Sequence, residues 1–194
     1  MDSVFMKNLR AADEGVYFTP ACCEKWIDTA FAGMKTIKSY KKRGTDYRLL
    51  NVPSAFDTET TTISDEEGTM YVWMWGLNGA VMVGRTWDEF SYICTRLRKR
   101  LFLNEELLLP VYVHNLGFDF QFMRKHLEIN ELFAMEELKP MYAIANNAFM
   151  FRCSYILTGM SLAECGKSLN KYKVSKKVSD LDYTLPRHSK TPLT

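Results

Sequence analysis

Two turn signals, each set between apolar runs, most limit the folds open to this chain. Asn78-Gly79 separates residues 70–75 from residues 80–83, and Asn146-Asn147 lies at the centre of a similar pattern in residues 141–155. Asn and Gly readily adopt the left-handed backbone conformation that a two-residue hairpin turn requires. We therefore expect two β-hairpins, and with them antiparallel pairing in a sheet.

Four stretches predict helices. Residues 86–89 (Thr-Trp-Asp-Glu) form a capping box, in which a hydroxyl and a carboxylate satisfy backbone N–H groups at the start of a helix. Residues 161–164 (Ser-Leu-Ala-Glu) form another, which opens a helix to about Asn170. Shorter helices are expected over Cys22–Phe31 and from about Asp119 to Leu127.

The order of these elements indicates the fold class. Short apolar strands are expected at residues 54–56 and 111–113, so the chain runs strand, hairpin, helix, strand, helix, hairpin, helix. Such an order predicts an α/β fold, in which helices flank a mixed β-sheet. We divide the chain into a helical and basic N-terminal extension, residues 1–50, and one domain, residues 51–194.

Charge and composition exclude several classes of protein. The net charge is +2, so affinity for nucleic acid must come from local patches such as the basic run within residues 35–48. No apolar stretch reaches the roughly 20 residues of a membrane-spanning helix, and the first residues do not form a secretory signal. Five cysteines without C-x-x-C spacing fit reduced core thiols. We expect a cytoplasmic protein with no membrane partner.

Acidic side chains follow both predicted strands. Asp57 and Glu59 come directly after residues 54–56, and residues two apart in an extended chain point to the same face. Asp119 follows residues 111–113 across a short turn, so it reaches the same end of the sheet if the strands are neighbours. Carboxylates gathered there repel one another unless a cation bridges them, and oxygen ligands favour Mg²⁺ or Mn²⁺. The alternative is an exposed acidic strand end.

The segments that carry these acids resemble known motifs. Residues 56–60 (Phe-Asp-Thr-Glu-Thr) and 114–119 (His-Asn-Leu-Gly-Phe-Asp) are similar to the first two exonuclease motifs of family B DNA polymerases. The similarity is greatest to the protein-primed polymerases of phages and linear plasmids. Residues 151–155 and 160–162 resemble a segment of these enzymes near the bound single strand, and residues 180–183 resemble the stretch before their third exonuclease motif.

The resemblance implies a ribonuclease-H-like sheet and a 3′–5′ exonuclease, a hydrolase that shortens single-stranded DNA 3′ ends with two Mg²⁺ or Mn²⁺ ions. It implies that Asp57 bridges both metals, that Glu59 holds the metal that activates water, and that Asp119 holds the other. Two such ions stabilise both the attacking and the leaving oxygen of a phosphodiester displacement. The remaining matched residues, together with two nearby lysines, would contact the DNA: Thr60, His114, Asn115, Phe118, Ser154, Lys176 and Lys177.

The chain departs from the family in the third motif. That motif is Tyr-x-x-x-Asp on a following helix, and no tyrosine of this sequence has an aspartate four residues later. One metal ligand and the tyrosine that orients the water are therefore missing from these 194 residues, as is a polymerase palm. We expect a proofreading exonuclease domain, as a fragment or a split subunit, with low activity in isolation. Its partners would be a DNA 3′ end and the rest of a polymerase or a terminal protein.

A second hypothesis belongs to another class of protein. A phage-type protein that kept the fold and the DNA groove but lost catalysis would act as a DNA- or protein-binding module in the host cytoplasm. The missing third motif favours this hypothesis, whereas the presence of all three carboxylates favours the enzyme. We prefer the enzyme, because a chain that has lost catalysis has little reason to keep Asp57, Glu59 and Asp119 together.

Overall fold

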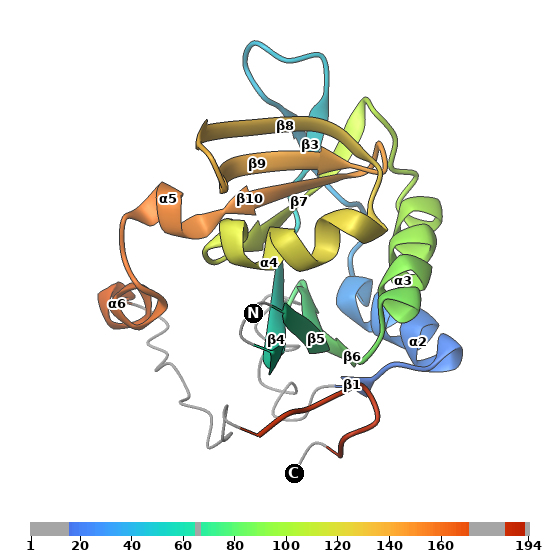
Figure 1. Cartoon of the computed structure of the whole chain (residues 1–194). Coiled ribbons are helices and arrows are strands. Elements are labelled where there is room, and N and C mark those ends of the chain that lie inside the picture. The colour runs from blue at the N-terminus through green and yellow to red at the C-terminus, as the bar shows by residue number, and fades with distance from the viewer. Residues whose placement is uncertain (1–15, 65–66, 171–184, 193–194) are drawn as a thin grey trace.

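The computed structural model describes residues 16–64, 67–170 and 185–192. Within these residues the main sheet is built from eight strands: β1 (Val16–Tyr17), β4 (Ser54–Ser64), β5 (Glu67–Leu77), β6 (Ala80–Gly84), β7 (Leu107–Val113), β8 (Ile129–Glu136), β9 (Lys139–Ala145) and β10 (Phe149–Cys153). Their spatial order is β1-β6-β5-β4-β7-β10-β9-β8, with both parallel and antiparallel neighbours. The predicted mixed sheet with flanking helices is thus confirmed (Figure 1).

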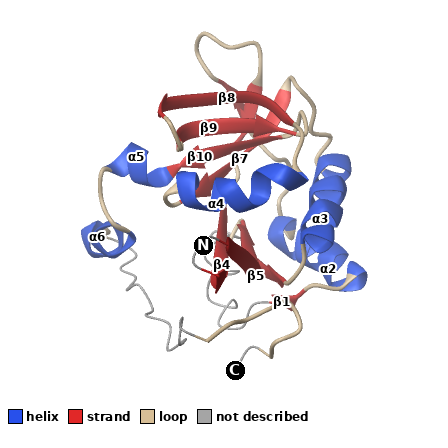
Figure 2. Ribbon diagram, viewed as in Figure 1, coloured by secondary structure: helices blue, strands red, loops and turns tan. Residues whose placement is uncertain are grey.

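Helices flank this sheet (Figure 2). A small hairpin of β2 (Ser39–Lys41) and β3 (Arg48–Leu50) pairs with β7 through β3. The helices, in chain order, are α2 (Pro20–Phe31), α3 (Trp87–Arg100), α4 (Leu116–Met123), the 3₁₀ turn η1 (Arg124–His126), α5 (Ser154–Thr158) and α6 (Leu162–Ser168). Among the described residues, no helix is both long and apolar enough to cross a bilayer.

Both predicted hairpins are present. Asn78 and Gly79 join β5 to β6, and both have positive φ angles, 46° and 88°. Asn146 and Asn147 join β9 to β10 in the same way, with φ angles of 55° and 47°. Asparagine tolerates this left-handed conformation better than other residues with a side chain. This preference explains why the Asn-Gly and Asn-Asn pairs alone predicted both hairpins.

The predicted capping boxes also form. The Thr86 hydroxyl accepts a hydrogen bond from the Glu89 N–H, and the Glu89 carboxylate accepts one from the Thr86 N–H. Ser161 and Glu164 make the same pair of contacts at the start of α6. The helix expected from Asp119 starts earlier, at Leu116, because the chain turns at once through a left-handed Asn115.

The core lies between the sheet and helices α2, α3 and α4, whose apolar sides all join one cluster. Aromatic rings fill its centre: Phe56 lies between the rings of Trp73, Trp75 and Phe90 at centroid distances of 5.1–6.4 Å. Helix α2, from the predicted N-terminal extension, contributes the buried Trp26 to this cluster. Residues 16–50 are therefore part of the same packed unit as the strands that follow.

Strand β7 is longer than expected, because it begins at Leu107 and contains Pro110. Proline has no N–H to donate to a ladder, so it is tolerated only where no neighbouring strand needs that donor. Neither β3 nor β4, the neighbours of β7 on one side, needs a backbone donor at Pro110. Strand β3 pairs with residues 107–108 and β4 with residues 112–113, which leaves Pro110 between the two contacts.

The described end of the chain returns to the β4–β6 side of the sheet. Arg85 holds it there, since its guanidinium donates to the carbonyls of His188 and Thr191 at 2.9 and 2.6 Å. Thr61 of β4 accepts a hydrogen bond from the Arg187 N–H at 3.3 Å. Residues 185–192 thus lie beside the strand that carries the predicted acidic residues (Figure 1).

Candidate active site

Strand β4 presents the first two predicted acids on the face of the sheet away from the core. Phe56 and Thr58 are buried, whereas Asp57 is exposed and Glu59 is half-buried. This alternation confirms that Asp57 and Glu59 share a face. A β-bulge follows directly, since the register with β5 shifts between Glu59 and Thr60. Bulges of this kind are common beside active sites, where they redirect side chains.

Asp119 of α4 reaches the same strand from the side of β7. Its Oδ1 accepts a hydrogen bond from the Thr58 N–H at 3.0 Å and another from the Thr58 hydroxyl at 2.6 Å. The carboxyl is almost fully buried, at 2% exposure. Thr58 lies between Asp57 and Glu59, so the structure brings the acid of the second motif to the strand of the first.

Asp119 can bind the Thr58 N–H because the pairing between β4 and β7 ends before Thr58. Strands β4 and β7 pair only at Ala55–Tyr112 and Phe56–Val113. Beyond Val113 the chain turns into α4, so β7 offers no carbonyl to the Thr58 N–H. The Asp119 carboxylate accepts that N–H instead.

The position of α4 depends on a glycine. A Cβ atom built on Gly117 would lie 2.4 Å from the backbone oxygen of Leu138. That oxygen belongs to the turn between β8 and β9, so only glycine allows α4 to approach this hairpin so closely. Gly117 thereby fixes the helix that carries Asp119.

Burial and neighbouring charge set the protonation of Asp119. Burial raises the pKa of its carboxyl above the ordinary value, and the negative charge of Glu59 raises it further. Hydrogen bonds from the Thr58 hydroxyl, from the Thr58 N–H and from its own backbone N–H oppose this rise. The two acids are therefore close enough for the charge of one to disfavour the charge of the other.

These side chains are oxygen donors of the type that Mg²⁺ and Mn²⁺ prefer. A bound cation would offset the repulsion between Glu59 and Asp119, so the donor chemistry suits such an ion. Within the described ranges, however, no three His, Cys, Asp or Glu side chains form a group that holds a metal ion. The metal ligand set that the family resemblance implies remains a prediction.

Two predicted DNA-contacting residues lie together beside the acids. His114, in the turn after β7, places its Nδ1 3.1 Å from the Oγ of Ser154, the first residue of α5. The Ser154 hydroxyl also lies 3.4 Å from the carbonyl of Val113. The ring of Tyr155 meets His114 edge-on at 5.7 Å. The segment around residue 154 is thereby joined to the second motif.

The remaining described candidates surround the start of α4. Asn115 is exposed and occupies the N-cap position, without capping the helix through its side chain. Phe118 is 46% exposed and packs its ring against Phe122 at 5.4 Å. Thr60 is half-buried at the β-bulge, beside Glu59. Lys176 and Lys177 lie outside the described residues.

The basic run before β3 is partly engaged within the protein. The Lys42 ammonium lies 5.3 Å from the ring centroid of Tyr142 and 5.9 Å from that of Tyr47. Lys41 and Arg43 are exposed. These two side chains, unlike Lys42, extend toward solvent and remain candidates for phosphate contacts.

Two residues of the candidate site were not predicted from the sequence. Thr58 holds Asp119 through its hydroxyl, and the exposed Tyr155 packs its ring edge-on against His114. Tyr155 follows Ser154 directly, so its place in the matched segment was an available signal. Nothing local to Thr58 reveals its role, because its partner lies 61 residues away.

In comparisons with known proteins, the sequence matches no family model and no curated protein. The resemblance to the polymerase exonucleases therefore depends on the motifs themselves and on their spacing.

Proposed function

We propose that this chain is a 3′–5′ exonuclease domain of the protein-primed family B DNA polymerase type, with a ribonuclease-H-like fold. The observation that carries the proposal is the contact between Asp119 and Thr58. It ties the acid of the second motif to Thr58, the residue between the two acids of the first motif. The negative charge of Glu59 raises the pKa of Asp119, which supports the proposal that these acids act on one phosphodiester.

Each group of residues has a distinct task in this proposal. Phe118 and Tyr155, 46% and 47% exposed, offer rings on which the bases of a frayed 3′ end stack. His114 and Ser154, whose Nδ1 and Oγ atoms are 3.1 Å apart, would orient the terminal nucleotide. Bound Mg²⁺ or Mn²⁺ would supply charge to stabilise the reacting oxygens, with Asp57, Glu59 and Asp119 as its ligands.

The test is cleavage of a 5′-labelled single-stranded oligonucleotide with Mg²⁺ or Mn²⁺. We expect a ladder that shortens from the 3′ end and slows about 10²-fold or more in Asp57→Asn, because a charged group at the reacting phosphate is lost. Asp46→Asn, at an exposed loop position, is the matched control and should cleave like the unchanged protein. A ladder that persists in Asp57→Asn contradicts the assignment, since it shows a contaminating nuclease.

A non-catalytic DNA-binding module is the second candidate. It is favoured by the absence of a three-ligand metal group from the described residues. For this candidate we expect the oligonucleotide to bind without cleavage under either metal, and Phe118→Ala with Tyr155→Ala to weaken binding. Base stacking contributes about 1–3 kcal/mol per base, so a loss of tenfold or more is expected for the pair.

A further inference from the structure

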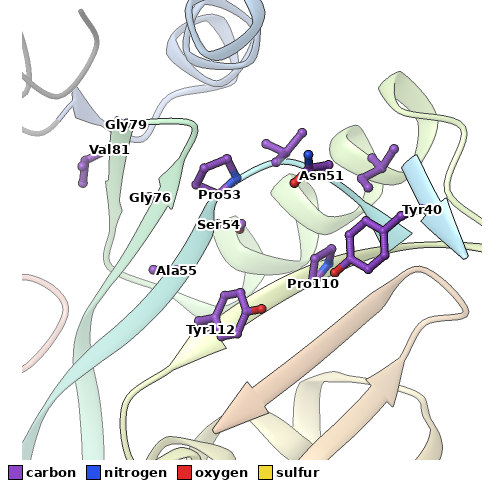
Figure 3. Close-up of a pocket in the computed structure, with 12 residues that line it drawn as sticks. Tyr40, Asn51, Pro53, Ser54, Ala55, Gly76, Gly79, Val81, Pro110 and Tyr112 are labelled. Atoms are coloured by element: carbon purple, nitrogen blue, oxygen red, sulfur yellow. The ribbon is translucent and has the colours of Figure 1, made fainter. Parts of the chain in front are cut away.

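The face of the sheet opposite the main core carries an apolar pocket of ≈ 550 Å³, here named the sheet-face pocket (Figure 3). The rings of Tyr40 and Tyr112 stand at one end, and Gly79 and Val81 lie at the other. Tyr40 is 43% exposed and Tyr112 is half-buried. The volume lies within the range of about 300–1,000 Å³ that is usual for ligand pockets.

The floor of the pocket is bare, and a cation stands behind one of its aromatic rings. Gly76 of β5 is opposite Ala55 of β4, which is opposite Tyr112 of β7. Tyr112 is in turn opposite Arg152 of β10, and directly opposed residues of neighbouring strands share a face of the sheet. The guanidinium carbon of Arg152 lies 5.8 Å from the centroid of the Tyr112 ring. One row of the sheet thus leads from the floor to an aromatic ring and then to a positive charge.

Two more aromatic rings continue this row. Tyr142 of β9 is opposite Arg152, and Phe133 of β8 is opposite Tyr142. The rings of Phe133 and Tyr142 stack with their centroids 5.6 Å apart. The Tyr142 hydroxyl donates to the Glu131 carboxylate, so the acid beside this ring already has a partner. Rings and one cation therefore follow one another across β7, β10, β9 and β8.

The β2–β3 hairpin brings further positive charge to the same face. Its Lys42 ammonium lies 5.3 Å from the ring centroid of Tyr142, which places the hairpin over this row. Residues 35–48, which include the hairpin turn, hold six Lys or Arg side chains and a single acid, Asp46. The net charge of the whole chain is only +2, so this face concentrates positive charge.

One of these cations stands at the rim of the sheet-face pocket. The carbonyl of Lys38 accepts a hydrogen bond from the N–H of Asn51, a pocket residue, at 2.8 Å. Lys38 is exposed and precedes Tyr40 by two residues. Among the described residues, no carboxylate forms a salt bridge with Lys38 or Arg152. Both positive charges are therefore available to an anionic ligand.

The combination of rings and cations indicates the class of ligand. An uncharged apolar ligand gains nothing from cations around its pocket. A single strand of nucleic acid carries flat bases, which stack on aromatic side chains, and phosphates, which attract Lys and Arg. The bases of a duplex are stacked on one another, so rings in a pocket favour the single-stranded form.

We propose that the sheet-face pocket binds a single strand of nucleic acid, with bases against Tyr40 and Tyr112 and phosphates beside Lys38 and Arg152. Asp57 follows Ala55 by two residues and shares its face of β4. A strand bound in the pocket therefore has a path along this face toward the candidate active site. Binding in the pocket requires neither a metal ion nor cleavage, so its test is independent of the proposed nuclease function.

Photochemical cross-linking locates the bases on the unchanged full chain. The protein is mixed in EDTA with a single-stranded oligonucleotide that carries iododeoxyuridine in place of thymidine, and the mixture is irradiated. Iodouracil cross-links to aromatic rings on which it stacks, so peptide mass spectrometry should find adducts at Tyr40 and Tyr112. Adducts confined to other residues, such as Phe118 and Tyr155, or a lack of adducts, would overturn the proposal.

The salt dependence of binding tests the cations. Fluorescence anisotropy of a labelled single strand, in EDTA, gives Kd over a series of salt concentrations. Each phosphate contact to a single strand contributes about 0.7 to the slope of log K against log salt concentration, so Lys38→Gln with Arg152→Gln should reduce the slope by about 1.4. Arg98→Gln with Lys99→Gln removes the same charge from exposed positions of α3 and should leave the slope unchanged. Equal slopes for the two double variants would contradict the proposed phosphate contacts.

The same measurement tests the rings. Tyr40→Ala with Tyr112→Ala should weaken binding at least about tenfold, because stacking of the bases is lost. Phe102→Ala, at a ring that is 80% exposed beyond the end of α3, should bind like the unchanged protein. Resistance of the buried Cys94 to iodoacetamide shows that each variant is folded. A folded Tyr40→Ala, Tyr112→Ala variant with undiminished affinity would overturn the proposal.

Discussion

The Asp119 carboxyl accepts two hydrogen bonds from Thr58, from the N–H at 3.0 Å and from the hydroxyl at 2.6 Å. Thr58 is flanked in sequence by Asp57 and Glu59, which face the other side of the strand. Helix α4, which follows β7, is thereby tied to the neighbouring strand β4 beside the two acids of the first motif. This contact should affect both the free energy of unfolding and its dependence on pH.

The Thr58 hydroxyl should stabilise the fold through the buried carboxylate. Thr58→Val keeps the backbone donor but removes the hydroxyl, and a hydrogen bond to a charged group contributes about 1.5–3 kcal/mol. We expect the free energy of unfolding in urea at pH 7 to fall by about that amount. Thr62→Val is the matched control, because Thr62 is exposed on the same strand. Equal effects of the two substitutions would show that the hydroxyl contact contributes nothing.

The raised pKa of Asp119 predicts a pH-dependent effect of Asp119→Asn. A carboxyl with a raised pKa in the folded state stabilises the fold most below its unfolded pKa, about 3.9, and progressively less as the pH rises through the folded value. Asparagine avoids the buried charge and keeps an oxygen for Thr58. We therefore expect Asp119→Asn to be more stable than the unchanged protein at pH 7, and this advantage to vanish below about pH 4.

Urea unfolding between pH 7 and pH 3.5 measures this difference. The exposed Asp46 supplies the control, since Asp46→Asn should give a difference in unfolding free energy that stays flat over the same range. A destabilised Asp119→Asn at pH 7 that recovers in acid would reverse the sign and contradict the assigned pKa direction.

Divalent cations should stabilise the chain through the same acids. A ligand that binds only the folded state adds about 2.7 kcal/mol at 100 times its dissociation constant. We expect Mn²⁺ to raise the melting temperature of the unchanged protein and of Asp46→Asn. The increase should be smaller in Asp57→Asn and Asp119→Asn. A shift that is the same in all four proteins would place the bound cation elsewhere.

Adjacent cysteines should differ in reactivity. Burial, with the nearby charge of Glu24, raises the pKa of the Cys23 thiol to about 11, and burial also raises that of Cys94. Cys22, the neighbour of Cys23 on α2, is half-buried. Because the thiolate is the reactive form, iodoacetamide at pH 8 should label Cys22 and spare Cys23 and Cys94. Peptide mass spectrometry resolves the sites, and comparable labelling of Cys22 and Cys23 would contradict this prediction.

Gly84 should not tolerate alanine. A Cβ atom there would lie 1.9 Å from the ring of Trp73, which is fully buried and donates its indole N–H to the Thr86 carbonyl at 2.8 Å. Overpacking of this kind costs about 1–3 kcal/mol or more. We expect Gly84→Ala to lower the free energy of unfolding in urea by at least that amount. Gly76→Ala, where the nearest atom is 3.8 Å away, should change it little, and a similar loss in both would reject the steric clash as the cause.

Local signals predicted much of this fold, and long-range register accounts for the rest. The hairpin at Asn78 and the capping box at Thr86 depend on a few adjacent residues, so the sequence alone sufficed. Strand β8 was not predicted, because its residues are almost all exposed and show no alternation of apolar and polar positions. The role of Thr58 was missed for a different reason, since it depends on where two distant strands stop pairing.

The short β4–β7 ladder has one further consequence. At Thr58 a side-chain oxygen stands where a main-chain carbonyl would close the next rung. An ionisable group therefore continues the contact between the two strands where their backbone pairing ends, so the position of the acid depends on the pairing of the sheet.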